Sequence, residues 1–208
     1  MKILFFGDSI TDMARSRDMD GKAFGYGVGF VNSIASTLKY ENPEKYDIVN
    51  RGISGNRIVD LYARIKADAW NHNPDVISVL IGVNDVWHEI YGENGVELNR
   101  FERVYRMLIE DTKAKLPNVK FILCEPFVLK GSATEEKYEE FCNVKKYAAV
   151  VKKLADEYGM PFVALQEKFD DAAEKHGAVH YLYDGVHPDL AGAKLIAEEW
   201  LKVFRKEI

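Results

Sequence analysis

The chain alternates between short apolar runs and longer segments with helical periodicity. Each run is bounded by glycine, proline or polar residues, as expected for a buried parallel strand. We therefore predict five strands, over Ile3–Phe6, Asp47–Asn50, Val76–Ile81, Phe121–Cys124 and Pro161–Ala164.

The segments between these runs have the spacing of amphipathic helices. Ile58, Leu61 and Ile65 recur every three or four residues, which places them on one helix face. Predicted helices cover Val28–Lys39, Arg57–Trp70, Leu98–Lys115, Glu136–Tyr158, Leu165–Lys175 and Leu190–Phe204. This alternation predicts an α/β fold, in which helices cover both faces of a parallel sheet.

The least patterned internal stretch is Trp87–Glu97, which contains Gly92 and Gly95. We interpret it as a loop that can overhang a site at the edge of the sheet. No repeat, low-complexity tract or break in composition divides the chain, so we expect residues 1–208 to form a single domain.

Composition narrows the range of functions. The 208 residues carry a net charge of −5 with scattered Lys and Arg, which argues against a general binder of nucleic acid or anionic membranes. Two cysteines, Cys124 and Cys142, do not make a disulfide framework. The apolar run after Lys2 is too short for a signal peptide or a membrane span, so we expect a cytoplasmic protein.

Ser9 carries the candidate chemistry. It lies just beyond the first predicted strand, where the chain turns into a loop. Far along the chain, Asp184 and His187 are three residues apart, a spacing that can place the carboxylate beside one ring nitrogen and leave the other for a serine. A serine at the end of a buried strand, with a distant Asp/His pair, is typical of a nucleophilic hydrolase.

Two more loops follow the second and third predicted strands. The first contains Gly52 and the second contains Asn84, and either loop can be an ordinary strand-ending turn. In a functional interpretation, Gly52 lets a backbone N–H approach a substrate, and the Asn84 amide donates to a developing oxyanion. Ligand sites in parallel α/β folds gather at the carboxyl ends of strands, which favours the functional interpretation.

These loops together resemble the four sequence blocks of the SGNH (GDSL) hydrolases. Gly7–Ile10, Gly52, Gly82–Asp85 and Asp184–Pro188 occur in the order of that family, and Ile10 replaces the leucine of the family name. The surrounding sequence is most similar to the intracellular carbohydrate acetylesterase branch, which includes acetylxylan esterases. The resemblance implies a three-layer, flavodoxin-like fold with five parallel strands, and ester hydrolysis that needs neither a metal nor another cofactor.

The resemblance also implies a role for each residue. Ser9 would attack the ester carbonyl, His187 would act as general base and then general acid, and Asp184 would orient the imidazole. The oxyanion hole would consist of the backbone N–H of Ser9, the backbone N–H of Gly52 and the side-chain amide of Asn84.

Asp8, Trp87 and Tyr183 flank the proposed catalytic loops and are candidate substrate contacts. The two aromatic rings can form a platform for a sugar ring or a small acyl pocket, or they can simply pack beneath a loop. His176 and His180 have the spacing of metal ligands on a helix, but no convincing third ligand accompanies them, so we assign no metal.

We therefore predict a serine esterase that hydrolyses acetyl esters, with O-acetylated sugars or xylo-oligosaccharides as substrates, through an acyl-enzyme on Ser9. A lysophospholipase or thioesterase of the same family is one alternative. A non-catalytic carbohydrate-binding module is another, although binding alone would not require the full set of Ser9, Asp184, His187 and Asn84. Exposed aromatic residues could also serve an interface in a homo-oligomer.

Overall fold

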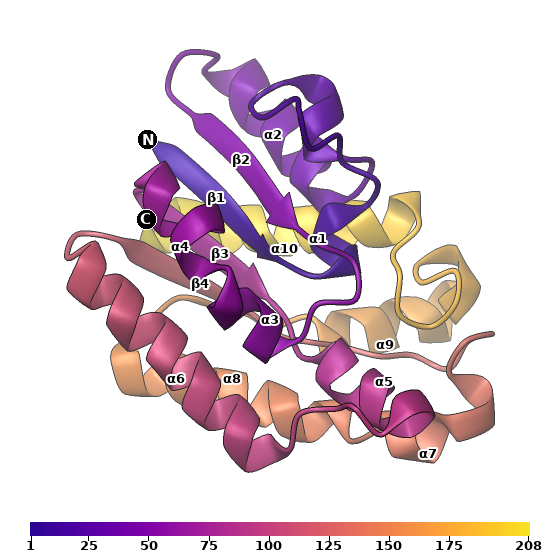
Figure 1. Cartoon of the computed structure of the whole chain (residues 1–208). Helices are drawn as coiled ribbons and strands as arrows, with labels where there is room; N and C mark the ends of the chain where they lie inside the picture. The colour runs from indigo at the N-terminus through magenta and orange to yellow at the C-terminus, as the bar shows by residue number, and fades with distance from the viewer.

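The fold is built on a five-stranded, entirely parallel sheet (Figure 1) in a computed structural model that describes residues 1–208. Its strands are β1 (Lys2–Gly7), β2 (Asp47–Gly52), β3 (Val76–Leu80), β4 (Lys120–Cys124) and β5 (Phe162–Val163). The strand order is β2-β1-β3-β4-β5, which is the flavodoxin-like order. The predicted α/β class and all five predicted strands are confirmed.

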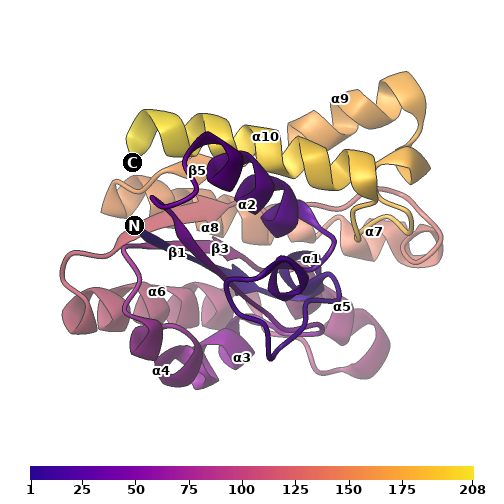
Figure 2. The same ribbon diagram turned by 90° about the horizontal axis from the view of Figure 1, so that it is seen from above.

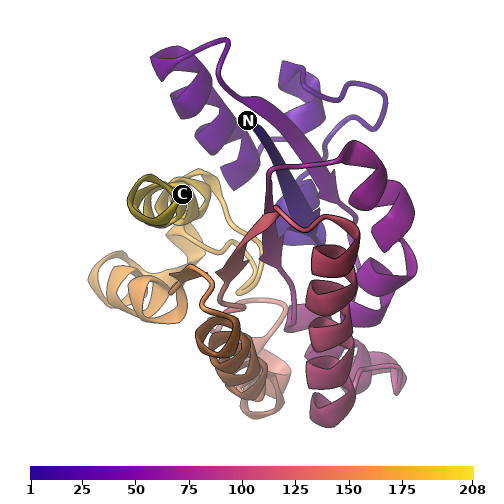
Figure 3. The same cartoon turned by 90° about the vertical axis from the view of Figure 1, so that its left-hand side faces the viewer.

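Helices cover both faces of this sheet. The α-helices are α1 (Ser9–Asp12), α2 (Phe30–Glu41), α3 (Ile58–Ala63), α4 (Ile65–Asp68), α5 (Val83–Gly92), α6 (Leu98–Lys115), α7 (Tyr138–Phe141), α8 (Val144–Tyr158), α9 (Gln166–His176) and α10 (Leu190–Glu207). Short 3₁₀ turns are η1 (Ala23–Tyr26), η2 (Trp70–His72), η3 (Glu135–Lys137) and η4 (Ala178–His180). Helices α2 and α10 pack together on one face, and α3 and α6 pack together on the other (Figures 2 and 3). None of these helices combines the length and the apolar character needed to cross a membrane.

The hydrophobic core forms one continuous cluster of 54 buried residues. Trp200 of α10 is its largest fully buried side chain, and its ring centroid lies 5.1 Å from that of Phe5 in β1. The indole Nε1–H donates to Ser78 Oγ in β3 over 2.9 Å, so its one polar atom is also satisfied. Trp200 therefore packs α10 against β1 and β3.

Two predicted helices are interrupted. The helix predicted over Arg57–Trp70 is broken at Arg64, whose guanidinium donates to the backbone oxygens of Gly7 and Arg51 at the strand ends. The helix predicted over Glu136–Tyr158 is divided before α8, where the Asn143 side chain donates to the backbone oxygen of Glu140. The Asn143 bond is local and competes with the helical backbone pattern, whereas the Arg64 bonds tie the break between α3 and α4 to the strand ends.

The prediction of a loop over Trp87–Glu97 is wrong for its first half. Helix α5 continues to Gly92, because Val83, Val86 and Ile90 recur at helical spacing and pack against the core. The helix ends at Glu93, which has a left-handed backbone with φ of 47°. No overhanging loop therefore begins at Trp87, and that side chain is held on a regular helix.

We predict that Trp200→Ala lowers the free energy of unfolding by about 3–5 kcal/mol, because it leaves a large cavity and removes the hydrogen bond from the indole to Ser78 Oγ. Urea denaturation followed by circular dichroism measures the change. Leu190→Ala on the same helix is the control, because Leu190 is 78% exposed and should shift stability by less than about 0.5 kcal/mol. Equal effects of the two substitutions would contradict the role of Trp200.

Candidate active site

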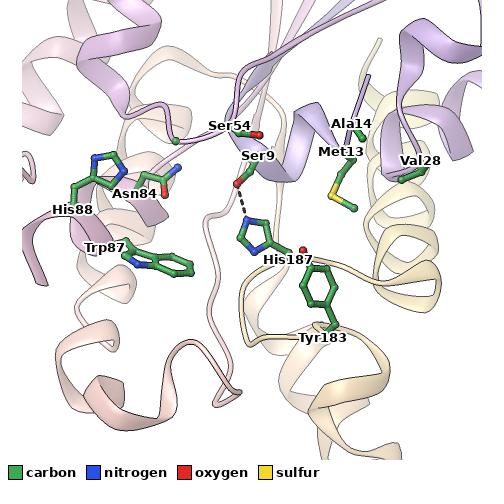
Figure 4. A pocket seen from close by; sticks show the side chains of 11 residues that line it. Ser9, Met13, Ala14, Val28, Ser54, Asn84, Trp87, His88, Tyr183 and His187 are labelled. Atoms are coloured by element: carbon green, nitrogen blue, oxygen red, sulfur yellow. Dashed lines mark hydrogen bonds between the residues drawn. The ribbon is translucent and has the colours of Figure 1, made fainter. Parts of the chain in front are cut away.

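The carboxyl ends of the central strands bring distant loops to one edge of the sheet. In the register of the sheet, Gly7 pairs with Gly52 on one side and with Leu80 on the other. The strand order reverses at β1, and such a switch point opens a crevice for ligands. A cavity of about 480 Å³ lies there (Figure 4), lined by Ser9, Met13, Ala14, Val28, Ser54, Gly55, Asn84, Trp87, His88, Tyr183 and His187.

Ser9, His187 and Asp184 form a continuous chain of contacts. Ser9 Oγ lies 2.8 Å from His187 Nε2, and His187 Nδ1 lies 2.7 Å from Asp184 Oδ2. The other carboxylate oxygen of Asp184 accepts from the backbone N–H groups of Val186 and His187, at 2.9 and 2.8 Å. The structure therefore brings the three predicted residues together in the arrangement of a nucleophile, a base and a group that orients the base.

The surroundings of His187 favour its protonated form. Burial alone would lower its pKa, but the hydrogen bond and charge of Asp184 and the charge of Asp8 raise it above 6.5. For Asp184, burial would raise the pKa, but the bonds from the His187 ring and from two backbone N–H groups lower it below 3.8. At neutral pH, Asp184 is thus an anion beside a ring that readily accepts a proton.

Asn84 is held close to Ser9 by the start of α5. It is buried, and its Nδ2 donates to the backbone oxygen of Asn56 over 3.0 Å. This bond uses one of the two amide hydrogens and fixes the plane of the side chain. The second hydrogen remains available to a group in the cavity that Asn84 lines.

The predicted role of Gly52 as an oxyanion donor is wrong. Its backbone N–H donates to Asn50 Oδ1 over 2.8 Å, and Gly52 is not among the residues that line the cavity. A Cβ at this position would lie 2.2 Å from the backbone nitrogen of Asp12. Gly52 is therefore the glycine that lets α1 pack directly against β2.

Gly55, three residues further on, occupies the place expected of Gly52. It lines the cavity in a left-handed conformation with φ of 82°. The N–H groups on either side are engaged: Ser54 N–H donates to Asp12 Oδ2 over 3.1 Å, and Asn56 N–H donates to Ile53 O over 3.2 Å. The N–H of Gly55 has no acceptor within the protein. The sequence contained this signal, because both glycines occur in the same run, Gly-Ile-Ser-Gly-Asn.

Asp8 is not a substrate contact, contrary to the prediction. Its side chain is fully buried; Oδ1 accepts from the backbone N–H of Ile10 and caps α1, and Oδ2 has no partner. Burial raises the pKa of Asp8 to about 7, and burial together with the charge of Asp8 raises that of the buried Asp85 to about 8. Burial therefore favours the protonated form of two carboxyl groups behind Ser9.

Trp87 and Tyr183, the other two predicted contacts, do line the cavity. The ring of Tyr183 stacks on that of His187, with centroids 5.8 Å apart and an interplanar angle of 18°. The ring of Trp87 lies 6.0 Å from His187. Both rings therefore flank His187 (Figure 4).

Several lining residues were not predicted from the sequence. Met13, Ala14 and Val28 form an apolar wall on the other side of Ser9, and His88 extends the side that carries Asn84 (Figure 4). Proximity to Ser9 was the only available signal for Met13 and Ala14. No group of three or more His, Cys, Asp or Glu side chains gathers as metal ligands would, and His176 and His180 have no third ligand.

Comparison with known proteins agrees with this geometry. Residues 5–195 match the model of the GDSL-like lipase/acylhydrolase family. The chain belongs to this family. It is 34% identical to an acetylxylan esterase from Geobacillus stearothermophilus, over 97% of this chain and 92% of the relative. It is 30% identical to an isoamyl acetate-hydrolyzing esterase from Saccharomyces cerevisiae, over 97% and 85%.

Solved structures of family members have the same fold. A protein described as a GDSL-like lipase from Parabacteroides merdae superposes with a TM-score of 0.91 at 38% identity, covering 97% of this chain and 94% of the other. The Geobacillus acetylxylan esterase superposes with a TM-score of 0.86 at 36% identity, covering 97% and 92%. The family member described here is a carboxylic ester hydrolase.

We predict that kcat/KM for an acetyl ester falls at acidic pH with a midpoint above 6.5, because only neutral His187 can accept a proton and its pKa is raised above that value. A pH–rate profile measures the midpoint. In the control, Asp184→Asn removes the main cause of the raised pKa, so NMR titration of His187 should give a lower pKa than in the parent protein. A midpoint below 6.5 in the parent protein would contradict this prediction.

Proposed function

We propose that the protein is a serine esterase that removes acetyl groups from O-acetylated sugars or xylo-oligosaccharides through an acyl-enzyme on Ser9. The contact chain from Ser9 through His187 to Asp184, open to a cavity with two aromatic rings beside His187, carries this proposal. The similarity to an acetylxylan esterase over nearly the whole chain supports the acyl group and the alcohol.

Catalytic mutants of the Geobacillus enzyme support the same three residues. Solved structures of that enzyme include catalytic mutants in which a serine, an aspartate or a histidine is replaced by alanine. The aspartate and the histidine lie three positions apart in that chain, as Asp184 and His187 do here.

Acylation begins when Ser9 Oγ attacks the ester carbonyl carbon and passes its proton to His187 Nε2. The negative charge of Asp184 stabilises the imidazolium that forms. Charge on the former carbonyl oxygen is met by the N–H of Ser9, the N–H of Gly55 and the free amide hydrogen of Asn84. When the tetrahedral intermediate collapses, the ester bond breaks, and the leaving alcohol oxygen takes the proton from His187.

Deacylation uses the same groups in the reverse sense. Neutral His187 takes a proton from a water molecule, and the water oxygen attacks the acetyl carbonyl. Collapse of the second tetrahedral intermediate returns the proton to Ser9 Oγ and releases acetate.

The alcohol side of the ester must lie near His187, because this residue protonates the leaving oxygen. Tyr183 stacks on His187, and Trp87 lies beside it. Rings of this kind offer flat apolar faces that can pack against the C–H groups of a pyranose, and each also carries a polar atom for its hydroxyls. A sugar as the alcohol half of the ester therefore fits this position better than a plain alkyl group.

We predict a graded loss of activity on p-nitrophenyl acetate. Ser9→Ala and His187→Ala should be nearly inactive, and Asp184→Ala should fall between them and the parent because the nucleophile and base remain. Asn84→Ala should lower kcat by about 10²–10³, the usual value of one oxyanion donor. Parent-level turnover by a Ser9→Ala protein freed of contaminating esterases would contradict the serine mechanism.

We predict that Tyr183→Ala lowers kcat/KM for acetylated xylobiose by about five- to tenfold, since an aromatic contact is worth roughly 1–1.5 kcal/mol. Hydrolysis of ethyl acetate, which has no ring to stack, should change by less than about twofold. Tyr183→Phe is the matched control and should keep most activity on the sugar. Equal losses on both esters would show that Tyr183 does not contact the sugar. In a separate measurement, a preference of the parent protein for p-nitrophenyl octanoate over acetate would indicate lipids or thioesters as substrates.

A further inference from the structure

The segment after the nucleophile helix contains two consecutive left-handed residues. Met13 has φ of 36° and Ala14 has φ of 58°. Met13, Asn73 and Glu93 each stand just after the end of a helix, but only Met13 is followed by a second left-handed residue, Ala14. A left-handed conformation is unfavourable for a residue with a Cβ, and backbone strain of this kind gathers at functional sites.

Contacts on both sides hold this conformation in place. Met13 N–H donates to the backbone oxygen of Ser9 over 3.0 Å, and the backbone oxygen of Met13 accepts from Val28 N–H over 2.8 Å. A Cβ on Gly29 would lie 2.6 Å from Met13 Cγ, so the neighbouring chain is pressed against the Met13 side chain. The strained pair is thus fixed between the nucleophile and the segment that follows η1.

The methyl group of Ala14 gains little from this position within the protein. The residue is exposed, and its side chain faces the cavity together with Met13 and Val28 (Figure 4). Glycine would adopt the same backbone at lower cost. Whatever occupies the cavity is therefore the main contact that the methyl group can make.

The geometry in which Ser9 attacks the ester carbonyl decides which part of the ester contacts the Ala14 methyl group. The carbonyl oxygen must point toward Asn84 and Gly55, and the leaving oxygen must lie near His187 Nε2. The third substituent of the carbonyl carbon, the acyl group, then points away from both. Figure 4 shows Met13 and Ala14 on the side of Ser9 opposite Asn84.

We propose that Met13 and Ala14 form an acyl wall, which contacts the acyl group of the ester and limits its length. This inference rests on the proposed esterase function. The acyl wall makes chain-length selectivity a property of the segment that leaves the nucleophile helix, whereas the aromatic rings select the alcohol.

The test measures kcat/KM for p-nitrophenyl acetate, butyrate and octanoate, so that the leaving group stays constant. Ala14→Gly removes the methyl group and should lower the acetate-to-butyrate ratio by about tenfold, the low end of the usual range for one carbon. Ala14→Leu extends the wall and should raise the same ratio. Glu93→Gly is the matched control: it replaces an exposed left-handed residue outside the cavity, and its ratio should stay within about twofold of the parent.

Thermal unfolding separates selectivity from strain. Ala14→Gly and Glu93→Gly should each raise Tm by about 1–4 °C, because both relieve a left-handed backbone. If Ala14→Gly raises Tm but leaves the ester ratio unchanged, the strain is purely structural and the acyl wall is overturned. Changes of the ratio in the same direction in Ala14→Gly and Ala14→Leu would overturn it as well.

Failure of the acyl wall can be told from failure of the esterase function. If the parent hydrolyses acetate and Ser9→Ala does not, the function stands whatever Ala14 does to the ratio. If Ser9→Ala keeps parent turnover, or the parent hydrolyses none of the three esters, the function falls and the acyl wall falls with it.

Discussion

The catalytic edge of the molecule depends on the close packing of α1 against the end of β2. Asn50 makes the central contact: buried in β2, it donates from Nδ2 to the backbone oxygens of Thr11 at 2.7 Å and Tyr26 at 2.9 Å, and it accepts from Gly52 N–H. One side chain thus joins the strand to the nucleophile helix and to η1. Because loss of Asn50 would leave three buried backbone groups unpaired, the position of Ser9 is set by β2 as well as by β1.

The same packing holds the turn that contains Gly55 and places a buried carboxyl group near His187. Asp12, at the end of α1, accepts from both the N–H and the hydroxyl of Ser54, so the helix that carries the nucleophile also orients the turn that presents Gly55. Behind Ser9, the buried Asp8 has a pKa of about 7, and its ionised form raises the pKa of His187. The protonation of His187 is therefore coupled to a carboxyl group that no substrate reaches.

The sequence predicted the strands and the Ser-His-Asp contacts because both depend on local signals: short apolar runs mark buried parallel strands, and catalytic side chains follow the ends of those runs. It failed where tertiary contacts decide. Gly52 and Gly55 look alike in the sequence, and only the packing of Asp12 and Asn50 determines which N–H faces the cavity. Burial of Asp8 likewise follows from the fit of α1 against the strand ends.

Specificity for the two halves of the ester has different structural origins. In the proposed function, the alcohol side is formed by the side chains of Trp87 and Tyr183, which project from α5 and from the loop that carries His187. A substitution there requires no change of backbone. The proposed acyl side is shaped by the backbone itself, since the backbone N–H of Met13 donates a hydrogen bond to the backbone oxygen of Ser9. A rearrangement of Met13 and Ala14 would therefore move the nucleophile. It follows that substitutions in this fold can change specificity for the alcohol more readily than they can admit a much longer acyl chain. The exception is a substitution that changes only the side chains of the acyl wall.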